Sequence, residues 1–318
     1  MIRLILTVCC TIYMVVYPAN AQNKVKYRCA SIEEARRLLS TEDGYIRNLS
    51  PFDIVSRLEN PNGTKEDFIQ LSAGEVMEWT EKEKRAIDQM TQDINDTISK
   101  YNYNIPFPEE IILIKSPLKA EGGANGYTRN NCIVLIDGLF QDHYDGDHMR
   151  LLLHETFHIL TRNNLEFKKQ MYATIGFSTT KEELEYPKDL WQWRISNPDV
   201  SRYDSYATFT IDNRPQKCAM ILYANRPYTN GRFFQYMNVG FVPLDDHLKP
   251  IRKGENTVVY SMDKVSDFYN KVGYNTRYII HPEEIMADNF VIAFLNKQKV
   301  PTLALKEKVQ YILKQSFK

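Results

Sequence analysis

The 318-residue chain carries no excess of either charge and has few cysteines. Its 40 Lys and Arg residues are matched by 40 Asp and Glu residues. Such a chain produces no long-range field that attracts nucleic acid, so we expect no nucleic-acid partner. Beyond residue 21 only Cys29, Cys132 and Cys218 remain, which allow at most one internal disulfide. This number excludes a disulfide scaffold, and the spacing disfavours a structural zinc site built from cysteines.

Long apolar runs are also missing, since none approaches the roughly 20 residues that span a bilayer. The nearest candidate is the start of the chain. There, Arg3 precedes an apolar stretch at residues 4–17, and Pro18-Ala19-Asn20-Ala21 forms a small-residue cleavage pattern. We therefore predict a signal peptide at residues 1–21. The mature chain is expected to be exported, periplasmic or secreted, without stable membrane insertion.

An apolar content of 43% is sufficient for a sizeable core, and helix-like and strand-like patterns follow one another along the chain. Helical spacing is clear after the capping sequence at Thr80, where Ile87, Met90, Ile94 and Ile98 recur. Strands are expected at 110–115 and 132–136, and helices at 149–160, 282–296 and 302–314. Together these patterns predict an α+β protein.

The domain organisation is expected to follow these patterns. Residues 22–77 read as a helical N-terminal segment and residues 78–318 as the main domain. Within that domain, residues 177–275 are rich in aromatic side chains and turn dipeptides. They are expected to form an insertion or specificity lobe.

The predicted helix at 149–160 contains the sequence His154-Glu155-Thr156-Phe157-His158. Histidines four residues apart lie on one helix face, so two imidazoles can converge on one metal ion. Glu155 lies close enough to act as a base on a water molecule there. Two core histidines on an ordinary helix are the alternative, but burying these polar groups without a metal is costly. The motif therefore predicts a zinc hydrolase site with ligands His154 and His158 and the general base Glu155.

Catalytic zinc usually takes three protein ligands. Thr161 and Asn164 stand where an extended HExxHxxGxxH motif has Gly and His, so the metzincin arrangement is excluded. Glu284 and Asp288 lie one turn apart on the predicted helix 282–296. We expect Glu284 to be the third ligand and Asp288 to orient a ligand histidine through its other ring nitrogen. Other side chains remain open as the third ligand: Glu166, Glu182, Glu183, Glu185, His247, His281 and Glu283.

With these two motifs the sequence resembles the gluzincins, metallopeptidases that combine HExxH with a glutamate on a later helix. Ala287, just before Asp288, is similar to several gluzincin branches, and Pro282 and Tyr278 resemble the branch that contains anthrax lethal factor. The resemblance covers residues 80–165 and 270–296. It implies a zincin-like fold, with a mixed sheet, an active-site helix beneath it and an edge strand that pairs with an extended peptide.

The spacing between the motifs departs from this family. Glu284 follows His158 by 126 residues, which is long for a gluzincin. Residues 177–275 are therefore expected to lie outside the shared fold.

The resemblance implies a zinc-dependent peptidase whose partner is a peptide or protein substrate. Tyr278 is the first candidate for the donor that stabilises the oxyanion, with Tyr274 and His281 as alternatives. A catalytically silent zincin-like protein that binds peptides or glycans is a competing hypothesis, as is a zinc hydrolase of non-peptide amides. Because a silent relative would commonly lose the base, the presence of Glu155 favours an enzyme.

The strand at 132–136 directly precedes the active-site helix, where the resembled fold places its edge strand. The stretch Gly122–Asn131 is then expected to line the cleft and donate main-chain hydrogen bonds to the substrate. A surface hairpin is the alternative.

Overall fold

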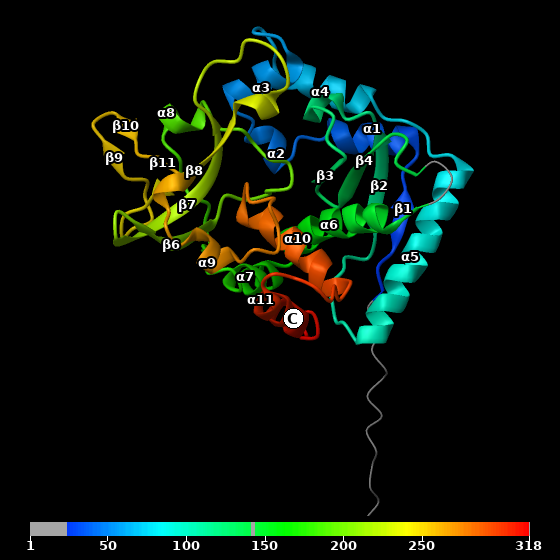
Figure 1. Ribbon diagram of the computed structural model, residues 1–318. Helices are drawn as coiled ribbons and strands as arrows, with labels where there is room; N and C mark the ends of the chain where they lie inside the picture. The colour runs from blue at the N-terminus through cyan, green and yellow to red at the C-terminus, as the bar shows by residue number, and fades with distance from the viewer. Residues whose placement is uncertain (1–23, 141–143, 318) are drawn as a thin grey trace, which may run out of the picture.

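The computed structural model describes residues 24–140 and 144–317, so the predicted signal peptide lies outside the described residues. One half of the protein is built on a four-stranded mixed sheet, seen on the right of Figure 1, with strand order β1-β2-β4-β3. β1 (Tyr27–Cys29), β2 (Ile111–Ser116) and β4 (Cys132–Ile136) are parallel, while β3 (Gly126–Arg129) is antiparallel to β4. β3 therefore forms one edge of the sheet.

The strand at 132–136 is internal, contrary to the expectation that it would stand at the edge. It pairs with β2 on one side and β3 on the other. A tight hairpin returns the chain between β3 and β4, and Asn130 adopts the left-handed conformation there, with φ of 50°. The edge position thus belongs to β3, inside the stretch Gly122–Asn131 that was predicted to line the cleft.

Successive side chains along a strand point to opposite sides of a sheet, and here both sides carry apolar side chains. Helices therefore cover both faces. On one face, Ile114 and Val134 pack against α1 (Ile32–Ser40) and α4 (Lys65–Gly74). On the other, Leu113 and Ile133 join a core with α5 (Glu81–Tyr101) and α6 (Gly146–Asn163). The N-terminal segment also holds α2 (Gly44–Arg47) and α3 (Pro51–Leu58). Since β1 comes from this segment, its residues take part in the main sheet.

The second half is built on a five-stranded antiparallel sheet with strand order β11-β8-β7-β6-β5, seen on the left of Figure 1. Its strands are β5 (Phe177–Thr179), β6 (Ser205–Ile211), β7 (Arg214–Ala224), β8 (Met237–Pro243) and β11 (Tyr260–Ser261). A small hairpin of β9 (Arg252–Lys253) and β10 (Asn256–Thr257) extends from it. Phe209, Met220 and Phe241 of this sheet belong to the same apolar core as the central helices, which joins the two halves.

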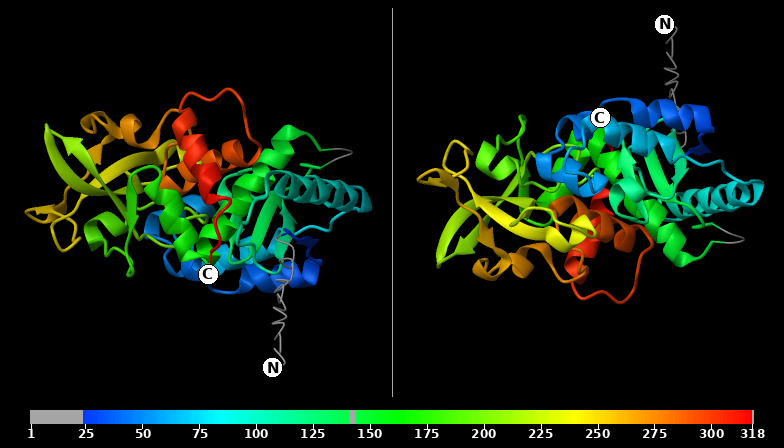
Figure 2. Two further views of the ribbon diagram at one scale, coloured as in Figure 1. Left: turned by 90° about the horizontal axis from the view of Figure 1, so that it is seen from below. Right: turned by 90° about the horizontal axis from the view of Figure 1, so that it is seen from above.

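The remaining helices lie between and around the two sheets (Figures 1 and 2). They are α7 (Leu165–Ala173), α8 (Lys188–Trp191), α9 (Phe268–Val272), α10 (Pro282–Phe294) and α11 (Leu303–Ile312), with short 3-10 turns η1 (Lys119–Glu121), η2 (Phe233–Tyr236) and η3 (Met262–Lys264). No helix in the described residues is long and apolar enough to cross a membrane. The α+β class and the mixed sheet are confirmed.

Helix α10 packs on α6 at the centre of the molecule and is buried along almost its whole length. Its apolar residues join the main core, yet it also buries Glu283, Glu284 and Asp288. Buried carboxylates are costly unless they are paired, so these three side chains require partners. Each of the three has a histidine of α6 among its partners.

Candidate metal centre

The helix that carries the HExxH motif begins after the N-cap residue Asp145. The side chain of Asp145 accepts hydrogen bonds from the backbone N–H groups of Asp147 and His148, which satisfies the free donors of the first turn. Apolar side chains before and after the motif bury the helix in the core. His154 and His158 consequently lie one above the other on the face toward α10, with ring centroids 4.9 Å apart.

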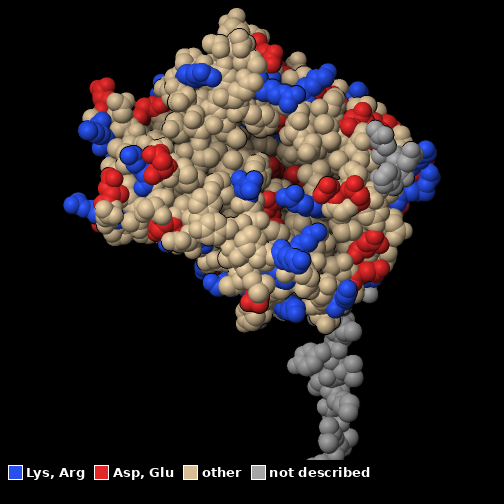
Figure 3. Space-filling model, in the orientation of Figure 1, with Lys and Arg blue, Asp and Glu red and all other residues tan. Residues whose placement is uncertain are grey.

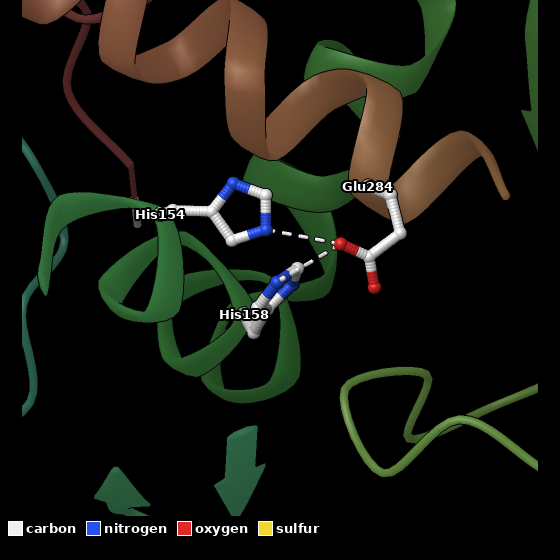
Figure 4. A group of neighbouring side chains, drawn as sticks. All are labelled: His154, His158 and Glu284. Atoms are coloured by element: carbon white, nitrogen blue, oxygen red, sulfur yellow. Dashed lines mark hydrogen bonds and ion pairs between the residues drawn. The ribbon is translucent and has the colours of Figure 1, made fainter. Parts of the chain in front are cut away.

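The facing helix α10 brings Glu284 to these two rings. It begins at His281, whose Nδ1 accepts the backbone N–H of Glu283, and Pro282 occupies its first turn. Oε2 of Glu284 lies 3.0 Å from Nε2 of His154 and 3.6 Å from Nε2 of His158. Figure 4 shows the two imidazoles and this carboxylate converging on one point.

Two further carboxylates hold the opposite nitrogens of the rings. Nδ1 of His154 donates to Asp288 at 3.2 Å, and Nδ1 of His158 donates to Glu283 at 3.1 Å. Asp288 thus occupies the orienting position predicted for it. Glu283 also accepts hydrogen bonds from the hydroxyls of Thr161 and Tyr172, so it points away from the point where the rings converge.

The convergent atoms fit a metal ion. One ligand atom each from His154, His158 and Glu284 lies within 4.8 Å of the other two, a spacing compatible with tetrahedral zinc bonds of roughly 2.0–2.2 Å. Nε2 of His158 is buried and has no hydrogen-bond partner among the described residues. A buried nitrogen without a partner is costly, and a cation at this point removes that cost.

The charges at this point also favour a cation. Burial by itself lowers the pKa of His158, but the negative charges of Asp199 and Glu284 outweigh it and raise the pKa to about 9. Burial by itself raises the pKa of Glu284, but the charged His158 and the hydrogen bond from His154 lower it to about 2. The positive charge of protonated imidazole rings thus balances the negative charge of the carboxylates. A divalent ion at this point would supply that positive charge instead.

Glu155 lies beside this group. It is 3% exposed, and its Oε2 atom has no hydrogen-bond partner among the described residues. Burial and the nearby charge of Asp199 raise the pKa of Glu155 to about 8. Strand β3 passes very close to it, since a methyl group at Gly126 would lie 3.1 Å from Oε1 of Glu155. The carboxylate is therefore held between the edge strand and the two histidines, with one oxygen free.

Of the three side chains predicted as oxyanion donors, only Tyr278 stands in the cleft next to the histidines. Its ring centroid is 6.1 Å from that of His154, and it lines both cavities that flank the site, of about 80 Å³ and 410 Å³. The charge of Glu284 and burial raise its pKa, so the hydroxyl keeps its proton. Tyr274 stacks on Tyr269 with rings 5.2 Å apart, and burial lowers the pKa of the capping His281 to about 4.

The other candidates for the third ligand are placed elsewhere. The side chains in question are exposed and belong to none of the potential metal-binding groups in the described part of the chain: Glu166, Glu182, Glu183, Glu185 and His247. Glu283 orients His158, and His281 caps α10. Of these candidates, only Glu284 belongs to a potential metal-binding group with both histidines in the described residues.

Two residues of the site were not predicted. The side-chain amide of Asn197 donates to Oε1 of Glu284, and Asp199 forms a second close group with Glu155 and His158. Both lie in the loop before β6, 40 residues beyond the HExxH motif. Their local signal is only the turn sequence Asn-Pro-Asp, which is common in loops that bind nothing.

Comparison with models of protein families, with curated proteins and with solved structures gives no match. The conclusion therefore comes from the geometry alone. His154, His158 and Glu284 form a buried group that could hold a metal ion, with a free carboxylate oxygen of Glu155 beside it.

Proposed function

We propose that this chain is an exported zinc-dependent peptidase of the gluzincin type. The observation that carries the proposal is the convergence of His154, His158 and Glu284 next to the unpartnered oxygen of Glu155. Two imidazoles and one carboxylate match the ligand set of catalytic zinc, which leaves a fourth position for water or substrate. Nitrogen and oxygen donors without a thiolate or a full oxygen cage favour zinc over calcium or magnesium.

The residues of the chain divide the reaction between them. Zinc bound here would polarise the scissile carbonyl and make a water molecule more acidic. Glu155 accepts the proton of the attacking water and transfers it to the leaving amine. Tyr278 donates its hydroxyl proton in a hydrogen bond to the oxyanion. Asp288 and Glu283 keep the two imidazoles oriented through Nδ1.

The surroundings support a peptide substrate. β3 is the edge strand of its sheet and passes beside Glu155, and an extended peptide can add to an edge strand through main-chain hydrogen bonds. Figure 3 shows a hollow near the centre of one face of the molecule, with acidic side chains at its bottom and basic ones around it. The export proposed for the chain rests on the sequence of residues 1–21, and the even charge supports a protein rather than a nucleic-acid substrate.

Zinc stoichiometry and peptide cleavage together test this function. We expect one zinc per mature chain by atomic absorption after dialysis, and a large loss in Glu284→Ala. Glu155→Gln should keep the zinc but lower kcat on a mixed peptide library by at least about 1,000-fold, because it removes only the base. Glu182→Gln, exposed and remote, is the matched control. A parent that holds no zinc after reconstitution, or a Glu155→Gln variant with full activity, would refute the proposal.

A further inference from the structure

Residues 195–201, between α8 and β6, cross the cleft next to the candidate metal centre. The backbone N–H of Ser196 donates to Oδ1 of Asp53 at 2.9 Å, and Arg57 donates to the carbonyl of Ser196 at 2.6 Å. Arg162 of α6 donates to the carbonyl of Pro198 at 3.2 Å. Asp53 and Arg57 are themselves buried and paired at 2.6 Å. The segment is therefore a fixed wall of the cleft.

Asp199 projects from this wall toward the reacting groups. Its Oδ1 accepts the backbone N–H of Thr128 at 2.7 Å and the hydroxyl of Thr128 at 2.8 Å. Within the described chain, no hydrogen bond or ion pair reaches its second oxygen. One carboxylate oxygen of Asp199 lies within 4.8 Å of ligand atoms of both Glu155 and His158. Glu155 has its own unpartnered, buried oxygen at the same place.

The hydrogen bonds from Thr128 to Asp199 occupy one end of the outward-facing edge of β3, to which a peptide could add. The carbonyl of Asn125 accepts a hydrogen bond from Ile136 of β4, so odd-numbered residues of β3 face β4 and Gly126 and Thr128 face outward. The outward N–H of Thr128 is already bonded to Asp199. A peptide that added antiparallel to β3 would run from Thr128 toward Gly126, so its upstream residues would meet Asp199. The N–H of Thr128 is therefore not free to bond to a peptide that continues past this point.

An apolar cavity opens on the same side. Its volume is about 80 Å³, and Asp199 and Tyr278 line it together with Ile195, Leu222, Phe233 and Ile280. Arg57 and Glu121 also reach its wall, but they are paired with each other at 3.2 Å and are not free to bind a charged side chain. The apolar side chains in this lining suit an apolar side chain of a substrate.

We propose that Asp199 binds the α-ammonium group of a peptide whose first side chain is apolar, so that the enzyme is an aminopeptidase. The inference rests on the proposed peptidase function. The α-nitrogen is only two bonds from the scissile carbonyl carbon, which matches the short separation of Asp199 from Glu155 and His158. A Lys or Arg side chain would place its charge several bonds further away.

The reaction is hydrolysis of the first peptide bond. The oxygen of water bonds to the carbonyl carbon, the C–N bond breaks, and a proton passes through Glu155 to the new amine. The products are one free amino acid and a peptide shortened by one residue.

The test compares two peptides on the zinc-loaded mature protein: Leu-Ala-Ala-Ala-Ala-Ala with a free N-terminus, and the same peptide N-acetylated. Mass spectrometry should show release of leucine from the first and at least 100-fold slower cleavage of the second. In Asp199→Asn, kcat/KM on the free peptide should fall roughly 10- to 100-fold because the charged partner of the ammonium is lost. The zinc content should stay at that of the parent. Asp246→Asn, whose side chain is fully exposed, is the matched control.

The other outcomes are distinct. Equal cleavage of the acetylated peptide, or cleavage at internal bonds, would overturn the amine site while leaving a peptidase. Loss of zinc from Asp199→Asn would make Asp199 a metal ligand and would also overturn it. If neither this pair nor a mixed peptide library is cleaved, the peptidase function itself fails, and the inference with it.

Discussion

Glu283 and Glu284 are adjacent in the sequence but bond to different parts of the site. Glu284 lies next to Nε2 of both histidines, whereas Glu283 lies next to Nδ1 of His158. Consecutive residues on an α-helix point about 100° apart, so one helix turn of α10 reaches both sides of a ring. Asp288, one turn further along, reaches Nδ1 of the other ring.

Replacing Asp288 with Asn tests the orienting role. We expect zinc affinity to fall roughly 10- to 100-fold, because the ring of His154 loses the carboxylate that fixes its orientation and its basicity. Competition with a chromophoric chelator measures the affinity. Asp263→Asn, an exposed carboxylate far from α6, should bind zinc as the parent does. Arg150 and Thr276 also bond to Asp288 and fix its side chain. An unchanged zinc affinity in Asp288→Asn would show that the charge of Asp288 is not needed to orient His154.

Replacing Tyr278 with Phe tests the oxyanion donor. The expected result is a kcat about 100-fold lower with zinc content unchanged, since only the hydroxyl is removed. Steady-state kinetics on the substrate found for the parent measures this. Tyr311→Phe is the control, because Tyr311 is 68% exposed and lies on α11. A kcat equal to that of the parent would remove Tyr278 from the mechanism.

The site residues that lie four positions apart on a helix could be predicted from the sequence, whereas the site residues on the loop before β6 could not. The i, i+4 spacings of His154 with His158 and of Glu284 with Asp288 state directly which side chains share a face. Asn197 and Asp199 reach the site only because the loop before β6 is folded back by bonds from α3 and α6. No local pattern in the sequence encodes such a long-range path.

Strand β3 and helix α6 approach each other closely at Gly126, and this contact tests the importance of the edge strand. In Gly126→Ala the new methyl group would lie 3.1 Å from Oε1 and 3.2 Å from Cδ of Glu155, so the carboxylate must shift. We expect kcat to fall at least 10-fold, because displacements of about 1 Å in reacting groups are costly, while zinc is retained. Gly74→Ala is the control, since nothing lies within 4 Å of its added methyl group. Full activity of Gly126→Ala would show that Glu155 has space to adapt.

The sequence-based prediction placed the strand at 132–136 at the edge of the sheet, where the structure has β3. The buried strand at 132–136 and the helix that follows it were predicted, but the short strand at 126–129 was read only as part of a glycine-rich stretch. A four-residue strand with Gly, Thr and Arg has little apolar periodicity, so its pairing is specified by β4 and the hairpin rather than by its own composition. That short strand is the one that reaches Glu155.

For the whole molecule, the buried ion pair between α5 and the first sheet contributes to stability against acid. Lys115 of β2 lies 3.0 Å from Glu83, with Asp137 as a second partner at 3.4 Å. Burial by itself raises the pKa of Glu83, but the Thr80 backbone N–H and Lys115 outweigh it and lower the pKa below its usual value. A carboxylate with a lowered pKa stabilises the fold above the unfolded-state value near 4.3, and this contribution is lost as the pH falls through the lowered pKa.

The expected result is a parent that loses stability steadily below about pH 4.3, with a shallower loss in Glu83→Gln. At pH 7 the variant should be less stable by about 1–3 kcal/mol, since Lys115 keeps only its longer contact with Asp137. The difference in the free energy of unfolding between parent and variant should become smaller at pH 3, where Glu83 of the parent becomes protonated. Urea unfolding at several pH values measures this, with Glu81→Gln, an exposed helix residue, as control. A difference that stays constant down to pH 3 would contradict the assigned role of Glu83.

At this scale the α+β class was predictable, while the arrangement of the halves was not. Helical and strand periodicities are local and identify most central elements. The five-stranded sheet was expected only as an aromatic-rich insertion or lobe. β6 and β7 are joined by the tight turn Asp212-Asn213, but the other strands pair across longer loops. Its attachment to the core depends on Phe209, Met220 and Phe241 meeting the central helices, a contact that no single segment specifies.

The potential ligands of the candidate metal centre lie on two helices, α6 and α10, that are far apart in the sequence. Glu284 follows His158 by 126 residues, and the segment between them forms the five-stranded sheet and the wall that carries Asn197. Contacts of such high sequence separation form late in folding, because a long loop must close first. Until then only the two histidines of α6 are available, a weak pair for a metal. Under the proposed function, capture of the ion would mark a late stage of folding, and a newly made chain would become active only when its folding is complete.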